Sequence, residues 1–443
     1  MRGAVIITFI PKQDSDLTQV KNYRPISLLN NDYKLFASIL AKRMKKLLQE
    51  VIHKDQAGFL PGRQMKDNIR NIINILEYLT ARNEKQAMLI FVGAEKAFDN
   101  ISWEFMLKKL EAMHVRQEFF NGIKAIYTEQ RAKLFVNNVT TEDIKITKGT
   151  RQGCPLSPLF ILVLEIFLRS IRKNKLIRGV TVAHNEYKVK AFADDLVLAV
   201  EELSRSVKEV LEEIEQFGQV AGFILNKKKT KIIAKNMEQG LIETMQQQIG
   251  IEVVKKVKYL GIWLTPKNID LFQNNYTPMW NGIKRDLEVW GRMKLSFWGR
   301  ISTIKMSMLP KMLFLFQTIP IIKGAVIFKE WQRTISRYTW QGKKPRIQFA
   351  NRCERKRTWV PAESITDEYL VEEFHSLFPD KPKPLARFWE EEFGPTDDEG
   401  FSCLCLCGFS CLRRGGSGGV RGRRIRLGSS TSGKRSERMG GWF

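Results

Sequence analysis

Two neighbouring aspartates, Asp194 and Asp195, stand between two apolar runs in residues 187–201, YKVKAFADDLVLAVE. The alternation on each side predicts two antiparallel strands joined by a tight turn that carries the pair. Two carboxylates this close repel each other, and a hard divalent cation with oxygen ligands would relieve the repulsion. The alternative is an ordinary Asp-rich hairpin turn, because aspartate is common in turns for conformational reasons. The apolar flanks favour a metal site but do not name a reaction.

A second stretch lacks a side chain where chemistry is expected. Residues 88–92, MLIFV, predict a buried strand, and the chain continues as GAEKAFD over residues 93–99. The end of such a strand is where α/β enzymes place reactive carboxylates, but this position is Gly93. Glu95 would be displaced from it by two strand residues, or about 6.5 Å. We therefore expect Glu95 to be a poor substitute for a carboxylate at position 93.

These residues must be positioned by a chain that alternates between helical and strand patterns. Apolar periodicity predicts helices over residues 32–52, 67–83, 103–113, 119–130, 159–174 and 202–222. Strand-like patterns occupy residues 4–10, 132–138, 142–147, 179–183, 226–233 and 257–264. Residues 22–32 are predicted to be a turn, and residues 56–64 and 149–158 to be loops rich in Gly and Pro. From residue 269 the pattern is helical and rich in tryptophan.

The net charge of +26 is the strongest global signal, because a polyanion is the natural partner of so basic a surface. The alternative is that the charge only prevents aggregation. Residues 362–400 are rich in Asp and Glu, and residues 401–443 in Gly and Arg, so the excess charge belongs to residues 1–361. No apolar run reaches the roughly 20 residues that a membrane span needs.

Six cysteines are too few and too unevenly spaced for a disulfide framework. Four of them lie between Cys403 and Cys411 in a C-x-C-x-C pattern, which is not the spacing of a zinc knuckle. A reducing compartment is the simpler interpretation, so we expect an intracellular protein, cytoplasmic or nuclear.

Seven stretches together resemble, in order and spacing, the motifs of a reverse transcriptase. They are YRPISLLN, QAGFLPGR, AEKAFD, GTRQGCPLSPLFILVLE, FADD, LNKKKT and KYLGIWLT. The similarity is greatest to LINE-type, non-LTR retrotransposons and extends from about residue 4 to about residue 345. It implies an α+β right-hand polymerase, with fingers and an antiparallel palm sheet in residues 1–268 and a helical thumb-like region in residues 269–345. Residues 346–443 resemble nothing in the family and are expected to be a largely disordered extension.

The resemblance also assigns residues to an RNA-directed DNA polymerase that uses two magnesium ions. Asp194 and Asp195 match its paired catalytic aspartates. Phe98 matches the bulky gate that excludes a ribose 2′-hydroxyl, although it could be simple core. Gln152 and Gly153 match the loop that holds the incoming nucleotide and the template.

Three basic residues are assigned in the same way. Arg24 and Arg63 belong to finger motifs that would face the triphosphate or the template backbone. Lys229 matches a palm lysine near the leaving phosphate, although it could be one member of a solvated lysine run. The implied partners are an RNA template, a DNA primer and deoxynucleoside triphosphates, with no membrane and no protein partner inferable.

The family pattern places an aspartate five residues before the gate, and that position here is Gly93. The missing aspartate would bridge both metal ions, so we expect a weakened magnesium site and crippled or absent catalysis. We interpret the chain as a truncated, degenerate retrotransposon copy, in which Gly93→Asp restores activity in part at best. The alternatives are a catalytically silent nucleic-acid-binding remnant and a product with no selected function.

Overall fold

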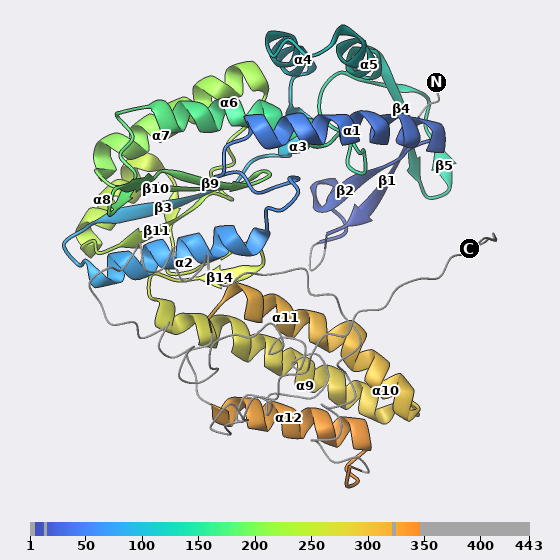
Figure 1. Cartoon of the computed structure of the whole chain (residues 1–443), viewed down its shortest axis with the longest axis vertical. Helices are drawn as coiled ribbons and strands as arrows, with labels where there is room; N and C mark the ends of the chain where they lie inside the picture. Colours follow the sequence, from blue (N-terminus) through green and yellow to red (C-terminus); the bar gives the residue numbers. More distant parts are fainter. Residues whose placement is uncertain (1–4, 13–15, 321–324, 346–443) are drawn as a thin grey trace, which may run out of the picture. The chain divides into compact units, whose positions relative to one another are not determined.

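The computed structural model describes residues 5–12, 16–320 and 325–345 (Figure 1). The described residues fall into two compact units, one that contains those up to residue 320 together with residues 333–344, and one that contains residues 325–332 and 345. All the named strands lie in the first unit. The predictions made for residues 346–443 lie outside the described residues.

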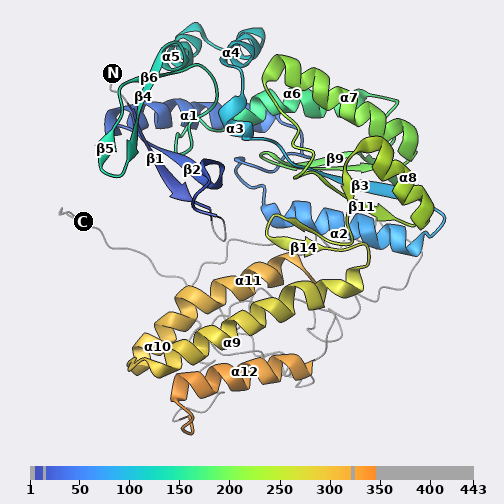
Figure 2. The same cartoon turned by 180° about the vertical axis from the view of Figure 1, so that it is seen from behind.

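A five-stranded sheet with the order β12-β11-β3-β10-β9 carries the two stretches with which the sequence analysis began. Its strands are β3 (Ala87–Val92), β9 (Val189–Phe192), β10 (Asp195–Val200), β11 (Lys231–Lys235) and β12 (Glu252–Val253). Strand β3 is buried at every position, because β10 and β11 flank it and helices cover both faces. Helices α6 (Leu159–Lys173) and α7 (Leu203–Ala221) cover one face, and α2 (Met65–Ala81) covers the other (Figures 1 and 2).

A second sheet has the order β2-β1-β4-β5, with β6 also paired to β4. Its strands are β1 (Val5–Pro11), β2 (Tyr23–Leu28), β4 (Gln130–Val136), β5 (Val139–Thr140) and β6 (Ile144–Ile146). The prediction of a turn over residues 22–32 was therefore wrong for residues 23–28. Pro25 lies in β2, opposite Phe9 of β1. Strand β2 is at the edge of the sheet. An edge strand accepts a proline because one of its sides has no ladder partner.

The remaining elements connect and extend these sheets. Helices are α1 (Asn31–Val51), α3 (Ala97–Asn100), α4 (Trp103–Ala112), α5 (Gln117–Tyr127), α8 (Gln239–Ile249), α9 (Thr277–Arg292), α10 (Phe297–Thr303), α11 (Leu309–Thr318) and α12 (Ala325–Trp340). Two hairpins are formed by β7 (Val180–Val182) with β8 (Asn185–Tyr187), and by β13 (Val257–Tyr259) with β14 (Ile262–Leu264). Short 3-10 turns cover Val20–Asn22 and Asn268–Asp270, and π-helical turns cover Phe272–Tyr276 and Ile304–Met308.

The mixed α+β class predicted from the sequence is confirmed. Besides β2, two further local features differ from what the sequence predicted. Strand β11 begins at Lys231, five residues later than predicted, because residues 226–230 form a turn. Helix α8 was not predicted, and its single buried residue, Met245, explains why it leaves no clear apolar periodicity.

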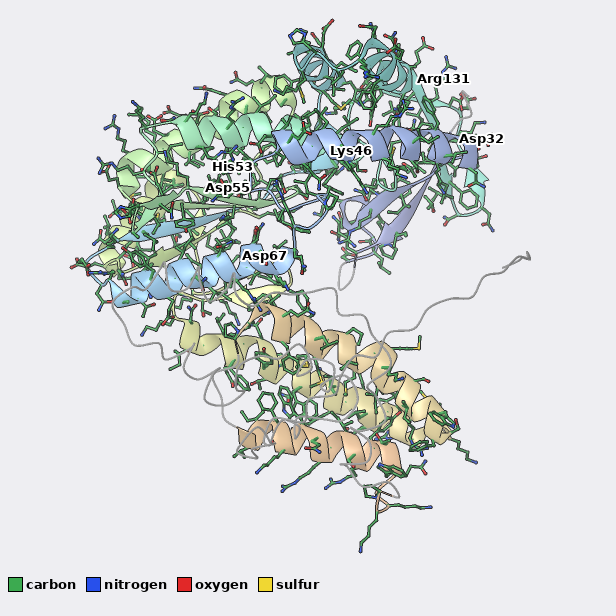
Figure 3. The ribbon with its side chains drawn as sticks, viewed as in Figure 1. Asp32, Lys46, His53, Asp55, Asp67 and Arg131 are labelled. Carbon is green, nitrogen blue, oxygen red and sulfur yellow. The ribbon has the colours of Figure 1, made fainter. Side chains whose placement is uncertain are left out.

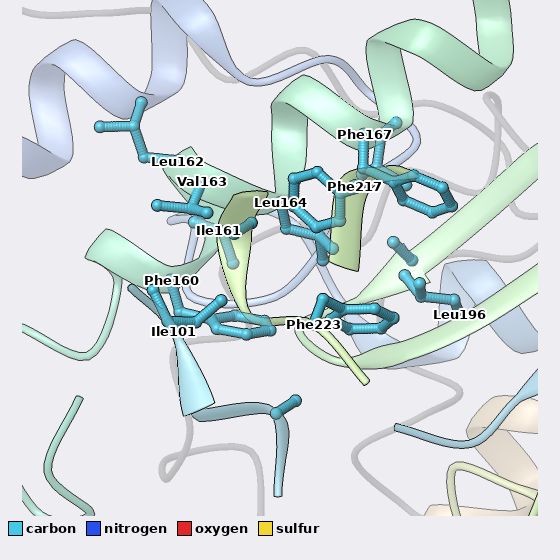
Figure 4. Close-up of a cluster of buried hydrophobic side chains, with 14 of the residues drawn as sticks. Ile101, Phe160, Ile161, Leu162, Val163, Leu164, Phe167, Leu196, Phe217 and Phe223 are labelled. Atoms are coloured by element: carbon cyan, nitrogen blue, oxygen red, sulfur yellow. The ribbon is translucent and has the colours of Figure 1, made fainter. Parts of the chain in front are cut away.

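The buried core beside the five-stranded sheet combines aliphatic side chains with a cluster of Phe rings (Figure 4). Phe167 of α6 stacks on Phe217 of α7, with ring centroids 5.3 Å apart, and Phe223 lies beside both. Almost the whole first half of α6 is buried, which holds the preceding loop in place. No helix among the described residues is long and apolar enough to cross a membrane.

Candidate active site

The Asp194–Asp195 pair lies at the β9–β10 turn, as the sequence predicted. Asp195 is opposite Phe192 in the ladder, so residues 193 and 194 form a two-residue turn. Asp194 is half-buried and Asp195 exposed. Protein atoms that displace water raise the pKa of Asp194, which the positive charge of Lys229 lowers in part. The same displacement of water, together with the charge of Asp194, raises the pKa of Asp195 to about 6.

Gly93 follows β3 and lies between two residues of opposite charge. Leu196 pairs with Val92, and Lys231 pairs with Phe91, so continuing each antiparallel register places Gly93 between Asp195 and Lys229. The backbone of Gly93 is bound on the Lys229 side, where its N–H donates to Thr230 Oγ1 at 3.0 Å. Its carbonyl accepts from the N–H of Asn226 at 2.8 Å.

This arrangement leaves no room for a side chain at position 93. A Cβ built on Gly93 would lie 2.5 Å from Lys229 Cβ, 2.8 Å from Lys229 C and 3.0 Å from Thr230 N. Two of these three atoms belong to the backbone, so a change of side-chain rotamer at Lys229 cannot remove the conflict. The turn over residues 226–230 would have to move.

The donor set fits a divalent cation only in part. Two adjacent carboxylates with raised pKa values are oxygen ligands that a cation would stabilise. Within the part of the chain that the structure describes, no group of three or more His, Cys, Asp or Glu residues is placed to hold a metal ion. Glu95 is exposed, and the pKa of Asp99 is raised by burial, yet neither joins the aspartate pair.

Phe98 is held between two other aromatic rings. It stacks on Phe160 with centroids 4.2 Å apart and meets Phe59 edge-on at 5.9 Å. Its carbonyl accepts from the N–H of Thr150 at 2.6 Å, which ties it to the loop over residues 149–158. The ring is half-buried, so its position is fixed while part of its surface remains accessible.

The loop that contains Gln152 and Gly153 lies against strand β2. The Gln152 carbonyl accepts from the N–H of Ser27 at 3.3 Å. Gly153 has φ of +92°, a left-handed conformation that favours glycine. At the start of the loop, Trp103 Nε1 donates to the Gly149 carbonyl at 2.7 Å. These contacts place the loop between the Phe98 segment and strand β2.

Three cations lie near enough to Lys12 for their charges to act on it, and together they form a basic cluster of Lys12, Arg24, Lys96 and Lys229. Of these four residues, the sequence predicted a role for Arg24 and Lys229. Partial loss of water lowers the pKa of Lys12, and the charges of Lys229, Arg24 and Lys96 lower it further. Lys229 also lowers the pKa of Asp194, so this member of the basic cluster acts on the aspartate turn as well. Lys12 was missed because it lies outside the seven motifs, and Lys96 because the resemblance assigned no role to it within AEKAFD. The available signal was that Lys12 lies just after a predicted strand and that Lys96 lies in a quoted motif.

Arg63 makes contacts that its motif did not suggest. Its Nη1 donates to the carbonyls of His53 and Gln56, both at 2.7 Å, and its Nη2 donates to that of Ile52 at 2.9 Å. The guanidinium therefore fastens both ends of the loop over residues 52–63. That Arg63 faces a triphosphate or a template stays a prediction.

The same loop carries an ion-pair network at the β9 edge of the five-stranded sheet. Asp55 contacts His53 at 2.9 Å and Lys190 at 3.1 Å, and Arg172 lies 3.7 Å away. Figure 3 shows His53 and Asp55 side by side near the end of α1. Burial lowers the pKa of His53 more than Asp55 raises it. The network anchors the loop to α6 and β9.

The chain is similar in sequence to known proteins. Residues 10–264, more than half of the chain, match the family described as reverse transcriptase (RNA-dependent DNA polymerase). The chain is 30% identical over 273 residues to the transposon TX1 uncharacterized 149 kDa protein of Xenopus laevis, a match that covers 61% of this chain and 20% of that protein. It is also 30% identical over 242 residues to the Pol polyprotein from retrotransposable element R2 of Popillia japonica, covering 54% and 33%.

Solved structures give a weaker similarity. The telomerase of Candida tropicalis, solved with a fragment of telomeric RNA, is 12% identical with a TM-score of 0.45, over 76% of this chain and 59% of that one. The telomerase of Candida albicans gives 12% and 0.42. The chain spans about a fifth to a third of the length of the two curated relatives. By the match over residues 10–264, the chain belongs to the reverse transcriptase family, and the relatives it resembles are proteins of non-LTR retrotransposons.

Proposed function

We propose that this chain binds an RNA template, a DNA primer and a deoxynucleoside triphosphate as a reverse transcriptase whose polymerisation is crippled. The observation that carries the proposal is the position of Gly93, between Asp195 and Lys229 with no space for a carboxylate. Asp194 and Asp195 remain to hold Mg²⁺, which when bound would neutralise charge on the phosphates. A two-metal site needs further ligands to keep its ions about 4 Å apart.

Other residues would bind the nucleotide. The edge of Phe98, fixed by two rings, would exclude a ribose 2′-hydroxyl by steric conflict. Gln152 and Gly153 would hold the base and the template from the opposite side. The basic cluster of Lys12, Arg24, Lys96 and Lys229 would hold the triphosphate, because a polyanion would relieve the repulsion that the other three cations exert on Lys12.

The proposed reaction is attack of a primer 3′-hydroxyl on the α-phosphate with release of pyrophosphate. Loss of one bridging carboxylate weakens the stabilisation of charge in the transition state, and each ~1.4 kcal/mol lost lowers the rate tenfold. In this proposal the basic cluster and Phe98 bind the substrates, and neither role needs a carboxylate at position 93. Substrate binding should therefore persist even though the reaction fails.

Primer extension on an RNA template with Mg²⁺ tests the proposal. We expect extension by the unmodified chain to be at or below detection, and Gly93→Asp to restore a small part at most, because residues 226–230 must move to admit the side chain. Any restored extension should vanish on adding Asp194→Asn. Robust extension by the unmodified chain would contradict the assignment of Gly93 to the missing ligand.

A second candidate is a silent nucleic-acid-binding protein, favoured by the net charge of +26, which suits a polyanionic partner whether or not the reaction occurs. Binding of an RNA–DNA duplex with no extension in any variant, including Gly93→Asp, would support it over a crippled polymerase.

A further inference from the structure

Gln56 lies in the loop between α1 and α2, and its side-chain amide reaches the turn that carries the aspartate pair. Gln56 is fully buried. Its Oε1 accepts from the N–H of Ala193 and from the N–H of Gly58, both at 2.8 Å, and its Nε2 donates to the Ala193 carbonyl at 3.2 Å. One side chain therefore pairs with both backbone groups of the residue that precedes Asp194.

Ala193 has a conformation that needs such support. Its φ is +53°, in the left-handed region that costs an L-residue about 1–2 kcal/mol. Hairpin turns usually place Gly, Asn or Asp there, and strained residues persist when the surrounding structure holds them. The surroundings are close, because a Cβ built on Gly58 would lie 2.4 Å from Ala193 N. Loop and turn pack backbone against backbone.

The same loop also reaches the gate. Phe59 meets Phe98 edge-on at 5.9 Å. Behind this contact, the N–H of Ala57 donates to the Ala191 carbonyl, and the N–H of Ala191 donates to the Asp55 carbonyl, both at 2.8 Å. Residues 56–59, called the QAGF strap from here on, thus contact the aspartate turn at one end and the aromatic gate at the other.

We propose that Gln56 is a positioning residue that holds the Ala193–Asp194 turn, so that the QAGF strap sets the aspartate pair relative to Phe98. Gln56 touches no reacting atom and acts only through the turn. The proposal rests on the proposed function in one respect, that Asp194 and Asp195 hold a cation. The competing explanation is that Gln56 contributes only stability, as any buried and hydrogen-bonded amide does.

Asn68 supplies a matched control. It is also buried, and its Nδ2 donates to the Ala191 carbonyl at 2.7 Å, on the same strand but two residues before the turn. Gln56→Met and Asn68→Leu each replace a buried amide with an apolar side chain of similar size. Loss of stability is expected from both, and loss of turn geometry only from Gln56→Met.

The experiment measures Mn²⁺ affinity of the full chain by the electron paramagnetic resonance of free Mn²⁺, with Asp194→Asn to identify the site. We expect Gln56→Met to weaken Mn²⁺ binding at least fivefold and Asn68→Leu to leave it within twofold. Adding Ala193→Gly to Gln56→Met should restore part of the affinity, because glycine adopts φ of +53° without strain. Equal affinity of folded Gln56→Met and Asn68→Leu, or no rescue by Ala193→Gly, would overturn the proposal.

A replacement variant and a second measurement cover the cases in which this experiment fails. If Gln56→Met alone does not fold, Gln56→Asn takes its place, since it is one methylene shorter and cannot make all three bonds. If the unmodified chain binds no Mn²⁺ that depends on Asp194, the metal part of the proposed function fails. In that case amide hydrogen exchange tests whether Gln56 holds the turn. Gln56→Asn should accelerate exchange at least tenfold at Asp194 and Asp195 relative to α6. Unchanged exchange at Asp194 and Asp195 would overturn the proposal that Gln56 holds the turn.

Discussion

At the scale of single residues, Gly93 is a steric requirement of this structure as well as the position at which we propose that a metal ligand is missing. We expect Gly93→Ala to lower the free energy of unfolding by about 1–3 kcal/mol, the usual cost of overpacking, because its Cβ would lie 2.5 Å from Lys229 Cβ. Gly282→Ala in α9 is the control. Nothing lies within 4 Å of a Cβ there, so this variant should gain up to about 1 kcal/mol. Urea denaturation measures both, and a neutral Gly93→Ala would contradict the packing described.

The aspartate pair gives a pH dependence of stability. The pKa of Asp195 is raised from 3.8 to about 6 by loss of water and by Asp194. A raised carboxyl pKa means that the folded state binds the proton more tightly, so stability present below pH 4 is lost as the pH rises through 6. Asp195→Asn should therefore raise the melting temperature relative to the unmodified chain at about pH 8 but not at about pH 4. The exposed Glu84→Gln is the control, and an equal gain at both pH values would contradict the assignment.

At the scale of elements, the loop over residues 52–63 depends on the fork of Arg63. Three carbonyls accept from its two Nη atoms at 2.7–2.9 Å, and a lysine cannot reproduce that geometry. We expect Arg63→Lys to cost about 2–3 kcal/mol of unfolding free energy. Arg131→Lys on the exposed face of β4 should be neutral. If Arg63→Lys is equally neutral but weakens triphosphate binding, the motif-based role of Arg63 is the correct one.

At the scale of the whole molecule, the net charge of +26 should make nucleic-acid binding sensitive to salt. Affinity of the full chain for an RNA–DNA duplex should fall steeply between about 50 and 200 mM salt, because bound cations are released from the phosphates. Lys12→Gln with Lys96→Gln should reduce the slope of log K against log salt by about one for each phosphate that the basic cluster no longer neutralises. Fluorescence anisotropy measures the slope. An affinity that does not change with salt concentration would contradict a basic nucleic-acid site.

The sequence by itself determined the family, the α+β class and the identity of the aspartate turn, because these depend on local patterns: apolar alternation around FADD, the buried run before Gly93, and the order of the motifs. It could not place residues that act across long separations. Gln56 and Ala193 are far apart in the chain, and only the tertiary structure shows that an amide in one loop satisfies a strained turn in another. The packing of Lys229 against Gly93 is likewise a consequence of the β3–β11 register. Pro25 looked like a turn residue because its place at a sheet edge depends on partners that the local sequence does not contain.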